Sequence, residues 1–275
     1  MSLFQRLLLL LIALSALPNA ARAELSFSTP PRGSEPAAES EKIYQGLAKL
    51  MSEAIGDKVV YAPARNMIEY NNKVRTGAYD LVLDGPHFTD WRTRQGTHRA
   101  IVMLPGEVAL VAVVLQGTRY VTIDDLAGRD ICVVPSSSFA SVTLASLFTN
   151  PSRAPRSVST GGGHRQLIDA LFDGRCEAAI LPEVNVRSHP RAAQLNVLWE
   201  SNPTPLLYLS VREKQLSEAQ IGRLTGLLMS EERMSPLMTP VLREFSPQAR
   251  SFVKANRNAI RGLGELLPLT SYGWQ

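Results

Sequence analysis

Short apolar runs alternate with longer amphipathic stretches over the first third of the chain. The runs "LSFS" and "LVLD" have the length and character of buried strands. The stretches between them repeat their apolar positions every three or four residues, as one face of a helix does. The pattern predicts strands at 25–28, 58–62 and 79–85, separated by helices at 35–56 and 66–77. Such alternation is typical of a parallel sheet with helices on both faces.

The same order restarts after a long apolar strand, "EVALVAVVLQ" (107–116). Strand-like and helix-like runs then alternate as they did before. From Ser217 onward the apolar spacing is helical, including "SPQARSFVKANRNAIRGLGELL" (246–267). The pattern predicts strands at 130–134, 156–160, 176–182, 195–200 and 205–213, with helices at 139–148 and 164–174.

Two similar α/β units followed by a helical tail predict two lobes, each built on a doubly wound and mainly parallel sheet. The second lobe, 117–204, is inserted into the first, which comprises 24–116 and 205–275. We expect a two-strand hinge near residues 115–118 and 204–206. The C-terminal helices are expected to pack on the first lobe.

The N-terminus has the form of a secretory signal peptide. Arg6 precedes the apolar run "LLLLLIALSAL" (7–17), and "ARA" (21–23) is a signal-peptidase pattern. The run is shorter than the roughly 20 apolar residues that span a bilayer. We therefore expect residues 1–23 to be removed by cleavage after Ala23. The alternative is a retained membrane anchor.

Charge and cysteine content narrow the class of protein. The net charge of +4 is mildly basic and suits an anionic small ligand. Nucleic-acid binding is not indicated, because the sequence lacks a stripe of arginine and lysine with interleaved aromatic residues. The two cysteines, Cys132 and Cys176, each begin a short apolar run. An even count in an exported chain predicts a disulfide, with two buried free thiols as the alternative.

Three consecutive serines, Ser136, Ser137 and Ser138, stand where a strand passes into a helix. Amide N–H groups at a helix N-terminus bind oxyanions, and hydroxyl groups add donors without adding charge. His164 begins a later helix after "GGG", where glycines let a ligand approach the backbone. We interpret these residues as an anion-binding set. The alternative is that the serines and the histidine only cap their own helices.

Further candidates follow other predicted strands. Arg65 and Asn66 occupy a strand-to-helix turn, His87 lies in the turn "DGPHF", and Glu183 follows "CEAAILP". Ligands of open α/β sheets bind beyond the carboxyl ends of the strands, so we expect these residues near a cleft. Solvated side chains are the alternative for Arg65 and Glu183.

A secreted serine hydrolase is the competing class of function. Nucleophilic catalysis needs a serine bonded to a base and the base bonded to a third group. The sequence has no G-x-S-x-G elbow and no H-E-x-x-H motif. We therefore expect a binding protein without catalytic activity, metal or cofactor.

Several motifs in order resemble the periplasmic phosphate, phosphite and phosphonate-binding proteins of ABC transporters. They include "RTGAYDLVLDGP" (75–86), "PSSSF" (135–139) and "GGGHRQLIDALFDGRCEAAI" (161–180). The resemblance implies a two-lobed class II binding-protein fold in the periplasm with a small oxyanion between the lobes. It also implies delivery to an ABC transporter permease in the inner membrane. We expect a monomer, and a ligand-binding sensor for a signalling partner is the alternative.

Overall fold

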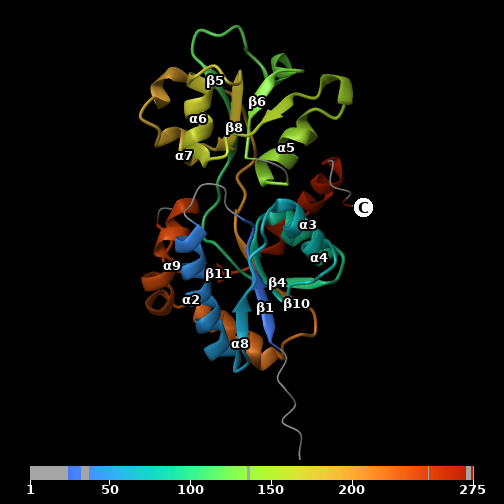
Figure 1. Ribbon diagram of the computed structural model, residues 1–275, viewed down its shortest axis with the longest axis vertical. Coiled ribbons are helices and arrows are strands. Elements are labelled where there is room, and N and C mark those ends of the chain that lie inside the picture. Colours follow the sequence, from blue (N-terminus) through green and yellow to red (C-terminus); the bar gives the residue numbers. More distant parts are fainter. Residues whose placement is uncertain (1–23, 32–36, 135–136, 247, 271–273, 275) are drawn as a thin grey trace, which may run out of the picture.

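The computed structural model describes residues 24–31, 37–134, 137–246, 248–270 and 274. These residues form two α/β units, one above the other in Figure 1. The predicted signal peptide lies outside the described residues. No helix among the described residues is both long enough and apolar enough to cross a membrane.

The first unit is a six-stranded sheet in the order β11-β4-β10-β3-β1-β2. Helices α2 (Ala37–Ile55), α8 (Glu218–Leu228) and α9 (Glu231–Phe245) cover one face, and α3 (Met67–Arg75) and α4 (Pro86–Arg94) cover the other (Figure 1). Neighbouring residues of β3 therefore enter different cores, because strand side chains alternate between faces. The strands are β1 (Leu25–Ser28), β2 (Val59–Tyr61), β3 (Leu81–Asp84), β4 (His98–Met103), β10 (Tyr208–Arg212) and β11 (Val253–Lys254).

The second unit is a five-stranded sheet in the order β7-β6-β8-β5-β9. Helix α5 (Phe139–Leu147) covers one face, and α6 (His164–Phe172) and α7 (Glu183–Arg187) cover the other. The strands are β5 (Leu110–Leu115), β6 (Asp130–Cys132), β7 (Arg156–Val158), β8 (Ala178–Pro182) and β9 (Leu195–Glu200). Short 3-10 helices complete the described chain: η1 (Ile123–Leu126), η2 (Pro151–Arg153), η3 (Ala192–Gln194), η4 (Arg257–Ile260) and η5 (Leu263–Leu269).

The α/β class is confirmed, and three details differ from expectation. Both sheets are mixed, because β10 pairs antiparallel with β3 and β4, and β5 does so with β8 and β9. Strand β5, which the sequence placed in the first lobe, belongs to the second sheet. The stretch 246–267, expected to be helical, contains β11 and 3-10 turns.

Two antiparallel segments join the sheets, 104–109 after β4 and 201–207 before β10. Val108 and Thr204 exchange both backbone hydrogen bonds, at 3.0 and 3.1 Å. The first crossing therefore precedes β5 and does not lie at 115–118, where the sequence placed it. This pair of segments is the candidate hinge.

The C-terminal segment closes one side of the two units. Helix η5 packs against α4 of the first unit and also contacts α5 of the second. Trp274 is fully buried, with ring centroids 5.5 Å from Phe88 and 5.1 Å from Trp91. Val142 of α5 belongs to the same apolar cluster. The two units are thus in direct apolar contact along this side.

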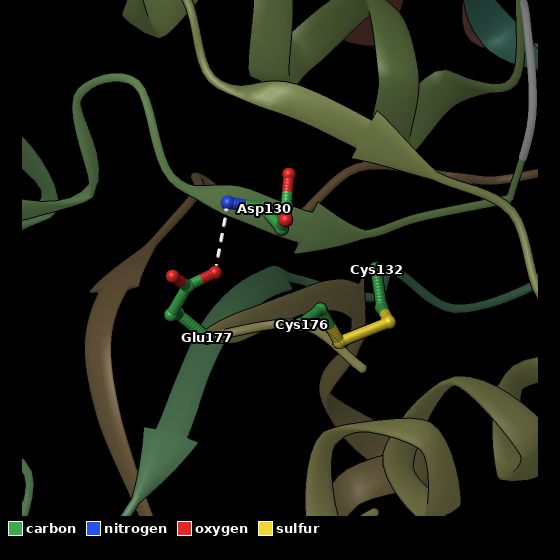
Figure 2. The surroundings of a disulfide bond; sticks show 4 residues. All are labelled: Asp130, Cys132, Cys176 and Glu177. Carbon is green, nitrogen blue, oxygen red and sulfur yellow. Dashed lines mark hydrogen bonds between the residues drawn. A yellow bond between two sulfur atoms is a disulfide. The ribbon is translucent and has the colours of Figure 1, made fainter. Parts of the chain in front are cut away.

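The predicted disulfide is confirmed. Cys132 at the end of β6 is bonded to Cys176 just before β8, with a Cα–Cα distance of 5.7 Å (Figure 2). Beside the bridge, the carboxylate of Glu177 accepts a hydrogen bond from the amide of Asp130 at 2.9 Å. The bridge therefore joins two neighbouring parallel strands and encloses both α5 and α6.

Replacing both cysteines with alanine (C132A/C176A) is expected to lower the free energy of unfolding by about 2–4 kcal/mol. The bridge spans a sequence separation of 44 residues and restricts the unfolded chain over that length. Urea unfolding of the parent and the variant measures the loss. Added reductant should destabilise only the parent. An unchanged unfolding midpoint in the variant would contradict the prediction.

Candidate anion-binding site

A cavity of about 480 Å³ lies between the two units. It opens at the carboxyl ends of parallel strands from both sheets: Thr29 follows β1, Asp84 ends β3 and Pro182 ends β8. This is where open α/β sheets bind ligands. The wall is completed by Pro30, Pro31, Tyr44, Arg65, Asn66, Met67, Leu83, Gly85, His87, Phe88, Leu110, Val134, Ser137, Ser138, Phe139, Ala140, Gly161, Gly162, His164, Leu206 and Leu207.

Four helices begin at this cavity. The first residues of α3 and α4 reach it from the first unit, and those of α5 and α6 reach it from the second. Each helix N-terminus carries amide N–H groups without intrahelical partners and about half a positive charge. Neither α4 nor α6 has a side chain capping its N-terminus. The cavity is therefore suited to an anion held by neutral donors.

Ser137 connects the two units through hydrogen bonds. Its backbone is left-handed (φ 66°), and its side chain is buried. The Asn71 amide of α3 donates to its Oγ at 2.7 Å, and Nε2 of His87 donates to its carbonyl at 2.7 Å. The Ser137 hydroxyl donates to none of the described residues.

Ser138 has a different role from Ser137. It is the N-cap of α5, and its Oγ accepts from the Ser141 amide at 3.1 Å while donating to the Val134 carbonyl at 2.8 Å. Its hydroxyl is therefore engaged by the start of α5 and by the loop that precedes it, which agrees with a capping role for this serine. Ser136 lies outside the described residues.

His87 is the second residue of α4 and is buried under the cavity. Burial lowers its pKa to about 4, so the imidazole is neutral at physiological pH. Because Nε2 faces a carbonyl, the proton resides on Nε2. Nδ1 is buried and has no hydrogen-bond partner among the described residues. A side chain at Gly85 would collide with the ring, since a Cβ there would lie 2.8 Å from Cε1.

Asp84 is the one carboxylate on the described cavity wall, and its charge is neutralised within the first unit. Arg92 donates two hydrogen bonds to it, at 2.6 and 2.8 Å, and both side chains are fully buried. Burial raises the pKa of Tyr70 well above its usual range, so its hydroxyl stays protonated and donates to Asp84 at 2.6 Å. Asp84 therefore presents little net charge to an anion.

The remaining candidates lie at different distances from the cavity. Arg65 lies at its rim with its side chain 87% exposed, and its Nε is paired with Glu69 at 2.8 Å. That hydrogen bond lowers the pKa of Glu69 to about 2. Asn66 caps α3, and His164 begins α6, both on the wall. Glu183 does not line the cavity, and its carboxylate pairs with Arg187 on α7.

Sequence reasoning missed Asn71 and Arg92. Asn71 lies in the middle of α3, and Arg92 lies in the last turn of α4. Both are buried polar residues on amphipathic helices, and their partners come from other elements. No local motif marks such residues. The usable signal is a polar residue at a position that the helical spacing assigns to the buried face.

The buried histidines predict a loss of stability in mild acid. His87 and His98 both have a pKa near 4 in the fold because burial disfavours the charged form, against 6.5 when solvated. The unfolded chain therefore binds protons that the folded chain does not as pH falls from 6.5 to 4. The free energy of unfolding should fall in this window by up to about 1.4 kcal/mol per pH unit for each histidine.

Chemical unfolding of the parent and of His87→Gln at pH 4.5 to 7.5 measures this slope. The variant should retain the contribution of His98 and show a shallower dependence on pH. Identical slopes for the two proteins would contradict the assignment of a depressed pKa to His87.

The family model described as "ABC transporter, phosphonate, periplasmic substrate-binding protein" matches residues 33–259. No curated protein matches the chain.

Several solved structures share the fold. XAC2383 from Xanthomonas citri, bound to ATP, aligns with a TM-score of 0.67 at 14% identity, covering 90% of this chain and 96% of that one. PhnD1 from Prochlorococcus marinus, in complex with methylphosphonate, aligns with a TM-score of 0.61 at 17% identity, covering 88% and 96%. A binding protein component of an ABC phosphonate transporter from Pseudomonas aeruginosa aligns with a TM-score of 0.61 at 14% identity, covering 87% and 83%.

At these identities the structures establish the fold, which is that of class II periplasmic binding proteins. The family model covers most of the chain, including every strand from β2 to β11 and the segments that begin α3, α4, α5 and α6. The resemblance noted in the sequence is thereby confirmed. The chain belongs to the phosphonate-binding family of periplasmic substrate-binding proteins of ABC transporters.

Proposed function

We propose that this protein binds a small phosphorus oxyanion, such as a phosphonate, phosphite or phosphate, between its two lobes and delivers it to an ABC transporter permease. The observation that carries the proposal is the convergence of four helix N-termini on one cavity. The two lobes are residues 24–103 with 208–274, and residues 110–200. The proposed location is the periplasm, as the family implies.

The donors proposed to hold the anion come from both lobes. They are the amide N–H groups at the starts of α4, α5 and α6, the Ser137 hydroxyl, and the His164 side chain. Backbone N–H groups at helix N-termini are well suited to phosphate-like groups. Two structural relatives were solved with phosphorus oxyanions, methylphosphonate in one and ATP in the other, which supports this class of ligand.

The hydrogen bonds around Ser137 favour binding over serine catalysis. A nucleophilic serine donates its hydroxyl proton to a general base. Here Nε2 of His87 instead donates to the Ser137 carbonyl, and Oγ accepts from an amide. Neither contact activates the hydroxyl, so we propose that Ser137 acts as a hydrogen-bond donor to the anion.

The proposal is tested by calorimetric titration with methylphosphonate, phosphite and phosphate, with acetate as the control anion. A phosphorus oxyanion should bind with one site per chain and raise the melting temperature as its concentration rises. Small-angle scattering should show compaction on binding if the segments 104–109 and 201–207 act as a hinge. A protein that is stabilised by none of these oxyanions would refute the proposal.

Replacing Ser137 with alanine is expected to weaken methylphosphonate binding at least about tenfold. A hydrogen bond to a charged group contributes about 1.5–3 kcal/mol, and about 1.4 kcal/mol corresponds to a factor of ten. Ser146→Ala is the matched control, because Ser146 lies near the other end of α5 and its hydroxyl donates, among the described residues, to the Thr143 carbonyl. Equal affinity in parent and Ser137→Ala would exclude the hydroxyl as a donor.

A further inference from the structure

The cavity is larger than a bare oxyanion requires. At about 480 Å³ it falls within the range of roughly 300–1,000 Å³ typical of pockets for drug-sized ligands. The lobes are already in contact on one side, through Ser137 and through the cluster around Trp274. The cavity volume therefore belongs to an arrangement in which the two lobes already touch on one side. A phosphonate group at the helix N-termini leaves most of the space to the rest of the ligand.

The side chains that line the cavity are mainly apolar. They come from both lobes and from the segment that connects them. Phe139 also stacks on His87, with ring centroids 5.6 Å apart and an interplanar angle of 23°. Such a surface stabilises an apolar or aromatic group by removing it from water. The principal residues are Tyr44, Met67, Leu110, Val134, Phe139 and Leu206.

The charged side chains of the described wall offer nothing to a charged substituent. Asp84 is neutralised by Arg92, and Arg65 is paired with Glu69 at the rim. An ammonium group in the cavity would find no unpaired carboxylate among the described lining residues, and burying it would be costly. The described wall therefore offers no partner for an ammonium group on the ligand.

We propose that this cleft selects a tetrahedral phosphorus oxyanion that carries one uncharged apolar or aromatic substituent, a phosphonate or a phosphate monoester. The inference rests on the proposed function and adds a preference within it. The anionic head lies at the helix N-termini, and the substituent lies against the apolar wall. Bare phosphate and aminoalkylphosphonates are the disfavoured ligands.

Calorimetric titration with five compounds tests the preference: phenylphosphonate, phenyl phosphate, methylphosphonate, 2-aminoethylphosphonate and inorganic phosphate. Phenylphosphonate should bind at least tenfold more tightly than methylphosphonate, and 2-aminoethylphosphonate should bind more weakly than either. Comparison of phenylphosphonate with phenyl phosphate distinguishes a C–P from an O–P linkage. A tenfold advantage for either phenyl compound supports the inference.

The variant Phe139→Ala tests whether the apolar wall of the cavity is the source of the preference for the phenyl compounds. The ratio of phenylphosphonate to methylphosphonate affinity should fall from at least ten to near one, and because it is a ratio, any loss common to both ligands cancels. Phe172→Ala is the matched control, since Phe172 ends α6 and does not line the cavity. Its ratio should equal that of the parent.

Two results would overturn the inference. If methylphosphonate or 2-aminoethylphosphonate binds as tightly as the phenyl compounds, the preference is wrong and the proposed oxyanion binding stands. If none of the five compounds binds, both the preference and the proposed function are wrong. An unchanged ratio in Phe139→Ala would exclude the apolar wall as the source of selectivity.

Discussion

Replacing Ser137 with aspartate is expected to weaken methylphosphonate binding about a thousandfold. Ser137 lies on the cavity wall just before α5 and is buried between the lobes. A carboxylate there would lie about 4 Å from a bound anion, where like charges repel by about 4 kcal/mol at an effective dielectric constant near 20. About 1.4 kcal/mol corresponds to a factor of ten in affinity. Titration calorimetry with methylphosphonate measures the loss.

Ser137→Asn is the matched control. Asparagine has nearly the size of aspartate, and both residues tolerate the left-handed backbone of this position. Only the charge differs, so the ratio of the two affinities isolates the electrostatic effect. The aspartate variant should stay folded, because a negative charge beside a helix N-terminus is stabilising. Equal affinities of the two variants would show that the anion does not lie at the start of α5.

Replacing Arg92 with methionine is expected to lower the free energy of unfolding by about 3–5 kcal/mol. Arg92 and Asp84 are both fully buried, and the substitution leaves the Asp84 carboxylate without its partner. Removal of one member of a buried ion pair typically costs this much, since the other charge stays buried and uncompensated. Binding of phosphorus oxyanions should also weaken, because Asp84 lies on the cavity wall.

Two controls separate these effects. Arg94 lies on the same helix as Arg92 and forms an exposed pair with Glu265 of η5, so Arg94→Met should cost at most about 1 kcal/mol. The double variant Asp84→Asn with Arg92→Met removes the uncompensated charge and should recover part of the stability and of the affinity. Urea unfolding and calorimetry give both quantities. Equal losses in Arg92→Met and Arg94→Met would contradict the role assigned to the buried pair.

Local signals predicted the elements that bring the site together. The Asn66 cap, the serines before α5 and the glycines before α6 are all features of a few consecutive residues. Each marks a helix start, and the alternation of strands and helices places those starts at one edge of a sheet. For this reason Ser137, Asn66, His87 and His164 were found from sequence as residues of one region.

What the sequence could not predict depends on contacts between distant elements. The "LVAVV" run of β5 is buried on both faces, and a continuous apolar run carries no information on which sheet receives it. Ser137 and Ser138 have different roles because Ser137 accepts a hydrogen bond from Asn71, which is 66 residues away in the sequence. Arg92 of α4 neutralises Asp84 at the end of β3, and this contact between a helix and a strand end leaves no local motif in the sequence.

The pairing of charges around the cavity has a consequence for the rate of capture. Arg65 and Asp84 each have an opposite partner, so the formal charge of the described wall is close to zero. The attraction that remains comes from the helix N-termini. This attraction acts over about one helix turn, a distance shorter than the screening length of roughly 8 Å in physiological salt. We expect little long-range steering of anions into the cleft. The association rate constant should therefore be nearly the same at low and at physiological ionic strength.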